Sequence, residues 1–234
     1  MLKYLSSRIS QFVPNGGIIS KSHTRQLYIN MQQLIEYDKT IKGIHHLSVL
    51  LGHESYKTTT ANLSASKSGL FSIDNLELNG AAVDGRASGS AKDSYNNEGY
   101  LARVQYDYAD KLFLSGSYRL DASSRFHPDH RWGSFWSFGA GWLINKEPWF
   151  KASWVDMLKI KASVGSQGND NIGNYRYLDT YGVGNASGNV SVAFGTKGNP
   201  NITWETNTNF NAGVDFDFFA GRLSGSAEYF YRHT

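Results

Sequence analysis

The 234-residue sequence has no cysteine, only four prolines and no apolar run as long as a membrane helix. Without cysteine there is no disulfide framework, no thiol nucleophile and no cysteine-based metal site. A transmembrane helix needs about 18 or more mostly apolar residues in succession, so a helical membrane protein is excluded. Lysine and arginine are scattered along the chain, and we therefore expect no nucleic-acid partner.

The clearest positive feature is an unbroken alternation of residue types over 207–218. Every second side chain there is apolar or small: Thr208, Phe210, Ala212, Val214, Phe216 and Phe218. The positions between them are polar, acidic or glycine: Asn207, Asn209, Asn211, Gly213, Asp215 and Asp217. A period of two predicts a strand with one greasy face and one polar face.

Similar alternation recurs along the chain and predicts about eight strands. Their ranges are 26–37, 46–56, 98–108, 112–121, 136–144, 158–165, 207–218 and 223–232. Residues 1–25, 57–97, 122–131 and 168–203 are polar and are predicted to be loops, whereas 145–157 suggests a short amphipathic turn or helix. Long and short connections alternate, as in outer-membrane barrels, where long loops are extracellular and short turns periplasmic. The short turns lie near 42–43, 110–111 and 220–221.

These patterns favour an all-β fold, an antiparallel transmembrane β-barrel segment of about eight strands from a larger barrel. A soluble β-sandwich also has alternating strands. Three features favour the barrel: aromatic residues near the strand ends, charges along the polar face, and strands longer than the usual ~5–6 residues.

The alternation assigns side chains to the two faces of the barrel wall. Candidates for the lumen are Arg103, Gln105, Arg119, Asp121, Lys161, Asn209, Asn211 and Asp215. Candidates for the lipid face are Leu114, Tyr118, Phe138, Val164, Phe210, Val214 and Phe216.

The sequence indicates no catalytic residues, no cofactor and no metal site. His127 and His130 flank a proline that prevents a helical pair of ligands, and they are interpreted as part of a polar loop. His45, His46 and His53 are interpreted as solvated histidines at strand ends. Asp215 and Asp217 resemble a glycosidase pair in spacing, but a hydrated lumen wall explains them better.

Four blocks of sequence resemble signatures of the SusC/RagA family of TonB-linked outer-membrane transporters, and they follow in the family's order. They are YDYADKLFLSGSYRLDASSRF at 106–126, RWGSFWSFGAGW at 131–142 with EPWF at 147–150, LKIKASVG at 158–165 with GNDNIGNY at 168–175, and NPNITWET at 199–206. The resemblance is good from about residue 98 onward and looser before it.

The resemblance implies that 1–234 is part of the β-barrel domain of a TonB-dependent receptor in the bacterial outer membrane. Its family imports glycans or peptides with a SusD-like surface lipoprotein, and TonB supplies energy. We expect an internal or C-terminal-half fragment of such a barrel, in contact with lipid, with the plug and the TonB-coupling residues in a missing N-terminal region. The alternatives are a small self-contained outer-membrane barrel or a soluble glycan-binding β domain.

Overall fold

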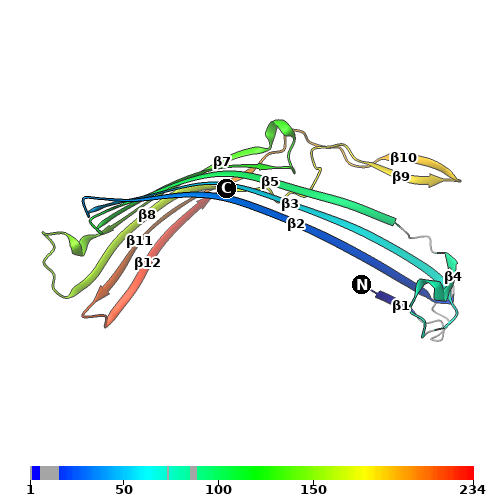
Figure 1. The fold of residues 1–234 in the computed structure, drawn as a ribbon, viewed down its shortest axis with the longest axis horizontal. Helices are drawn as coiled ribbons and strands as arrows, with labels where there is room; N and C mark the ends of the chain where they lie inside the picture. Colours follow the sequence, from blue (N-terminus) through cyan, green and yellow to red (C-terminus); the bar gives the residue numbers. More distant parts are fainter. Residues whose placement is uncertain (1, 6–15, 73, 85–88) are drawn as a thin grey trace. The chain divides into compact units, whose positions relative to one another are not determined.

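The computed structural model describes residues 2–5, 16–72, 74–84 and 89–234, and it consists almost entirely of β-strands (Figure 1). The strands are β1 (Leu2–Leu5), β2 (Ile18–Ile41), β3 (His45–Leu70), β4 (Ala81–Asp84), β5 (Gly89–Tyr108), β6 (Leu112–Ser123), β7 (Trp132–Leu143), β8 (Val155–Asn169), β9 (Tyr181–Ala186), β10 (Asn189–Phe194), β11 (Glu205–Phe218) and β12 (Leu223–His233). Short 3-10 turns are η2 (Leu78–Gly80), η3 (Pro128–His130) and η4 (Ile144–Lys146). Among the described residues, no helix is long and apolar enough to cross a membrane.

The long strands form one antiparallel sheet in which neighbours in the sequence are neighbours in space. The order is β1-β2-β3-β5-β6-β7-β8-β11-β12, with β4 paired to β3 and with β9 and β10 forming a separate hairpin. Over the described residues this order does not return from β12 to the first strands, so the sheet is open. The eight long strands confirm the predicted antiparallel all-β architecture.

The chain divides into two compact units, and strands β2, β3 and β5 contribute to both of them. Unit 2 comprises Asn30–Tyr56 and Asn96–Thr234. It holds the pairings from β5 to β12, which continue in register over most of each strand. Its few fully buried side chains include Phe126 and Ser123, close to the end of β6.

Unit 1 comprises Met1–Ile29 and Lys57–Tyr95, and polar side chains connect its strands. The Thr24 hydroxyl donates to the Asn62 side chain over 2.9 Å, and the Ser64 hydroxyl lies 3.4 Å from the carbonyl oxygen of Gly89. Ile19 is fully buried and provides a small apolar centre. Backbone pairing and polar contacts therefore hold the described strands of this unit together.

Several segments predicted to be loops are strands. β2 begins at Ile18, inside the range 1–25, while residues 6–15 of that range lie outside the described residues. β3 continues to Leu70 and β5 begins at Gly89, so much of 57–97 is paired. These extensions are rich in Ser, Thr and Asn and contain few large apolar residues, so the alternation on which the prediction depended is weak there.

The polar segment 168–203 was also predicted to be a loop but contains the β9–β10 hairpin. Its two-residue turn has left-handed backbone at Ser187, with φ of 53°, and at Gly188, with φ of 89°. Left-handed residues at both central positions give a turn whose twist matches that of the paired strands. The predicted amphipathic turn at 145–157 is a short 3-10 turn, η4, followed by irregular backbone.

Candidate functional site

The strand register places the sequence-predicted residues on two opposite faces of the sheet in unit 2. Directly paired residues share a face, and the pairs Gln105–Ser115 and Ser163–Asn211 belong to one of them. We call this the polar face, and it carries all eight lumen candidates: Arg103, Gln105, Arg119, Asp121, Lys161, Asn209, Asn211 and Asp215. The opposite, apolar face carries the seven lipid candidates: Leu114, Tyr118, Phe138, Val164, Phe210, Val214 and Phe216. The common face of each set follows from the register, whereas the medium that each face meets stays a prediction.

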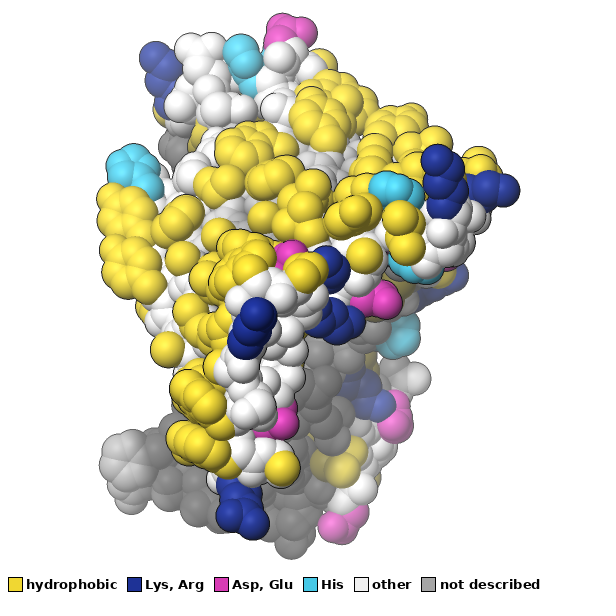
Figure 2. Space-filling model, turned by 90° about the vertical axis from the view of Figure 1, so that its left-hand side faces the viewer, with side chains coloured by type: hydrophobic (Ala, Val, Ile, Leu, Met, Phe, Trp, Pro, Cys, Tyr) yellow, Lys and Arg dark blue, Asp and Glu magenta, His cyan; other side chains and the backbone are white. Residues whose placement is uncertain are grey.

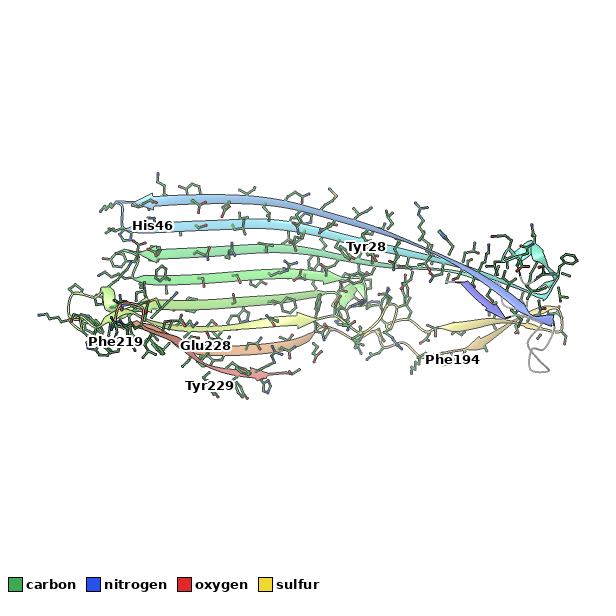
Figure 3. The ribbon with its side chains drawn as sticks, turned by 90° about the horizontal axis from the view of Figure 1, so that it is seen from below. Tyr28, His46, Phe194, Phe219, Glu228 and Tyr229 are labelled. Atoms are coloured by element: carbon green, nitrogen blue, oxygen red, sulfur yellow. The ribbon has the colours of Figure 1, made fainter. Side chains whose placement is uncertain are left out.

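One ion-pair network on the polar face joins three neighbouring strands. Lys161 of β8 lies with its Nζ 2.9 Å from a carboxylate oxygen of Asp215 in β11. The same Nζ contacts the carboxylate of Glu228 in β12, which Figure 3 labels on that strand. One cation is shared by two carboxylates, so the three side chains together carry a formal charge of −1.

A second ion-pair network on the polar face joins β6 to β3, two strands that are separated by β5. Arg119 of β6 donates through Nε to Asp121, at 2.7 and 2.8 Å from its two carboxylate oxygens. Its terminal nitrogen lies 2.7 Å from Glu54 in β3, so the side chain reaches over β5. Gly99 of β5 makes room for it, since a Cβ there would lie 2.4 Å from Asp121 Oδ1 and 2.8 Å from the guanidinium.

The polar face is hollowed near the short turns by a cavity of about 670 Å³. Residues without bulky side chains create the space, among them Gly139, Gly141 and Gly213. Charged and aromatic groups line it as well, and Lys159 lies with its Nζ 5.2 Å from the centre of the Phe113 ring. A cavity of this size, with convergent polar groups, is within the range of ligand sites.

Packed aromatic side chains lie at both ends of the strands on the apolar face, and others, among them Tyr118 and Phe138, lie between the ends. At the short turns, Trp154 packs against Phe218 and Phe219, with ring centres 5.1 and 5.6 Å apart. At the other end, Tyr100 and Trp132 stack with centres 6.2 Å apart. Figure 2 views the short-turn end, where hydrophobic side chains cover much of the surface and a few charged side chains lie between them.

The long connections of unit 2 meet in a cluster that sequence reasoning missed. The Ser123 hydroxyl donates to Asp170 over 2.7 Å, and Arg125 donates to the Asp170 carboxylate and carbonyl at 3.2 and 3.0 Å. Phe126, fully buried, packs against Trp204 with ring centres 5.3 Å apart. We call Ser123, Arg125, Phe126, Asp170 and Trp204 the loop-end cluster. Its members come from three of the signature blocks, which the fold brings together.

The two histidines of the predicted polar loop lie in and beside the η3 turn. Pro128 opens the η3 turn, and the rings of His127 and His130 lie 6.4 Å apart, with His127 Nδ1 3.3 Å from Asp129.

Glu54 was not among the predicted site residues, and neither was Glu228. Both belong to ordinary alternating strands, so only the register reveals that they meet Arg119 and Lys161.

Comparisons with known proteins agree with this geometry. The profile of the family described as "TonB dependent receptor-like, beta-barrel" matches residues 3–234. The chain is 34% identical over 144 residues to the TonB-dependent receptor SusC of Bacteroides thetaiotaomicron, a match covering 58% of this chain and 14% of that protein. It is 26% identical to the TonB-dependent receptor P39 of Formosa agariphila, over 99% of this chain and 23% of the relative.

Solved structures give the same result in three dimensions. The RagAB peptide importer in its closed-closed state superposes with a TM-score of 0.87 and 26% sequence identity, covering 92% of this chain and 24% of that chain. The open-open state of the same importer gives a TM-score of 0.84. The chain thus spans about a quarter of the length of P39 and of the RagAB chain.

Proposed function

Because the chain belongs to the TonB-dependent receptor-like β-barrel family, we propose that it forms part of the barrel wall of a transporter that imports glycans or peptides. The chain is a β-barrel portion of a SusC/RagA-like receptor of the bacterial outer membrane. The relatives named above are receptors and an importer. We propose the substrate class, the partner, and the assignment of the polar face to the lumen and of the apolar face to lipid.

The observation that carries this proposal is the chemical contrast between the two faces of the sheet. The polar face combines ion pairs such as Lys161–Asp215 with amides and with many Gly and Ser positions. Charged side chains retain their hydration in a water-filled lumen, whereas in hydrocarbon each would cost several kcal/mol, about 2–4 for Arg or Lys at the midplane. We therefore assign the polar face to the lumen.

The aromatic residues of the apolar face support the proposal that this face contacts lipid. β7 begins with Trp132 and has Trp142 as its second-last residue. Both side chains lie on the apolar face, ten positions apart. At about 3.3 Å per residue and a tilt of about 40°, ten positions span roughly 25 Å across the bilayer. This equals the height of the apolar band between the two aromatic girdles of outer-membrane barrels, about 25 Å.

The orientation and the partner follow from the same assignment. The short turns are assigned to the periplasm and the long connections, with the loop-end cluster, to the cell surface. We propose that a SusD-like surface lipoprotein binds at that surface, and that TonB acts through another region of the full-length protein. The similarity to the receptor SusC and to the RagAB importer supports this arrangement.

The proposal is tested by uptake in the source bacterium. A strain lacking the full-length protein is complemented with the wild-type gene or with a variant carrying Lys161→Glu, which places three carboxylates together on the polar face. Fluorescent oligopeptides and oligosaccharides are supplied separately, with and without a protonophore, and a tagged protein is purified to identify a lipoprotein partner.

We expect one substrate class to enter only with the wild-type gene and only while the proton gradient is intact. The Lys161→Glu variant, if it reaches the membrane in normal amount, should lower that uptake severalfold. Gradient-independent uptake, or no uptake of either class, would contradict the proposal. A tagged protein that purifies without any lipoprotein would contradict the proposed partner.

A further inference from the structure

Three side chains with metal-ligating atoms meet beside the short turn between β5 and β6. They are His46 at the start of β3, Asp107 near the end of β5 and Asp110 in the turn itself. A ring nitrogen of His46 and one carboxylate oxygen from each aspartate all lie within 4.8 Å of one another. Figure 3 labels His46 at this end of the sheet.

The two carboxylates carry like charges close together. Among the described residues, no lysine or arginine forms an ion pair with Asp107 or Asp110, and the nearby Lys111 pairs with Glu147 instead, at 3.6 Å. Two carboxylates this close repel each other, and the free energy of the pair falls when a cation binds between them.

Hydrogen bonds to one atom of His46 and one of Asp107 hold these two side chains in place. The Thr40 hydroxyl lies 2.9 Å from Nδ1 of His46, which leaves Nε2 of the imidazole for another partner. The backbone N–H of Asp110 donates to Oδ1 of Asp107 over 2.9 Å, which leaves Oδ2. Such outer contacts orient metal ligands and raise affinity in characterised sites.

We propose that His46, Asp107 and Asp110 bind a divalent transition-metal ion, and that Zn²⁺ is the ion this donor set favours. Imidazole nitrogen together with carboxylate oxygen suits Zn²⁺, whereas Ca²⁺ and Mg²⁺ prefer oxygen alone. Donor atoms of one tetrahedral Zn²⁺ lie about 3.3 Å apart, since each is about 2.0–2.1 Å from the ion. The three donor atoms, which lie within 4.8 Å of one another, would reach this spacing by rotation of their side chains. Water completes the coordination.

A bound ion would fasten the β5–β6 turn to β3. A backbone hydrogen bond already joins this turn to the residue that precedes β3, from Ala109 N–H to the Ile44 carbonyl over 2.7 Å. The ion would add a second connection on the polar face, where His46 and Asp107 also line the cavity. The expected effect is a more stable short-turn end, independent of which substrate the protein transports.

The test measures Zn²⁺ binding by the full-length protein in detergent, by titration against a chromophoric chelator. The variants are His46→Gln, Asp107→Asn and Asp110→Asn, and Thr40→Val removes the outer hydrogen bond. Asn tolerates the left-handed backbone of Asp110, with φ of 53°, so that variant should fold normally. His127→Gln is the matched control, because His127 also lies beside an aspartate, 3.3 Å from Asp129.

We expect one Zn²⁺ per protein at this site, with affinity at least tenfold weaker in each of the three ligand variants and about tenfold weaker in Thr40→Val. His127→Gln should change it less than twofold, and Zn²⁺ should raise the melting temperature of the wild type but not of Asp110→Asn. Equal Zn²⁺ affinity in wild type and Asp110→Asn, or loss of binding in His127→Gln alone, would overturn the proposal. Neither result depends on uptake, so failure here is distinct from failure of the transport function.

Discussion

Replacing Val214 by arginine is the perturbation that separates the two faces most clearly. Val214 lies on the apolar face of β11, paired with Ile160 and Ala227. It is four positions from Phe218, which packs against Trp154 at the short-turn end. Four positions correspond to about 13 Å along the strand and about 10 Å of depth at a 40° tilt. Val214 is therefore expected close to the middle of an apolar band about 25 Å tall.

The magnitude follows from that depth. An arginine facing lipid near the midplane of a barrel costs about 2–4 kcal/mol of unfolding free energy. Asn211 lies three positions away on the polar face, where its side-chain nitrogen is 3.4 Å from the Ser163 hydroxyl. Arginine at Asn211 would project into water beside Glu228, which also lines the cavity, and it should cost less than about 1 kcal/mol.

The assay is urea unfolding of the full-length protein in lipid vesicles, followed by tryptophan fluorescence, with Val214→Ala as a control for lost packing. We expect Val214→Arg to lower the unfolding free energy at least 2 kcal/mol more than Asn211→Arg does. The reasoning would be refuted by equal losses, or by a larger loss at Asn211.

Two further predictions concern the connections. Phe126→Ala should lower the unfolding free energy by about 3–5 kcal/mol in urea titrations, because Phe126 is fully buried against Trp204. The control Phe71→Ala, at a side chain that is 94% exposed, should change it by less than about 0.5 kcal/mol. Similar losses in the two variants would show that the loop-end cluster is not a packed unit. Single cysteines are informative in a chain that has none, so Ser187→Cys should react with an impermeant maleimide on intact cells and Arg222→Cys should not, and the reverse pattern would invert the assigned topology.

The strand cores were predictable because each has one apolar face. In β11 the alternation from Thr208 to Phe218 has no interruption, and the structure pairs the whole segment with β8 and β12. Period-2 patterning fixes which side chains share a face, since a slip of one residue would exchange the two faces. For this reason the two sets of candidate residues each emerged on a common face.

The strand ends and the networks were not predictable from the pattern. β3 continues to Leu70 through a segment rich in Ser, Thr and Lys, where the alternation is short and rests on Ala61, Leu63 and Ala65, so the periodic signal is weak. The β9–β10 hairpin does carry a signal, because Ser187 and Gly188 form a two-residue turn between alternating residues, and the prediction overlooked it. The contact between Glu54 and Arg119 joins positions 65 apart across an intervening strand, so it follows only from the register.

The central claim, that the apolar face meets lipid and the polar face the lumen, is tested most directly by spin labels on neighbouring residues of β7. Phe138 lies on the apolar face, and Ser137 lies on the polar face, where its hydroxyl is 2.7 Å from that of Ser117. Nitroxides at Phe138→Cys and Ser137→Cys, in cysteine-free full-length protein in vesicles, report collision rates with oxygen, which concentrates in lipid, and with a water-soluble nickel complex. We predict a ratio of oxygen to nickel collisions that is severalfold higher at Phe138 than at Ser137, and equal or reversed ratios would contradict the account.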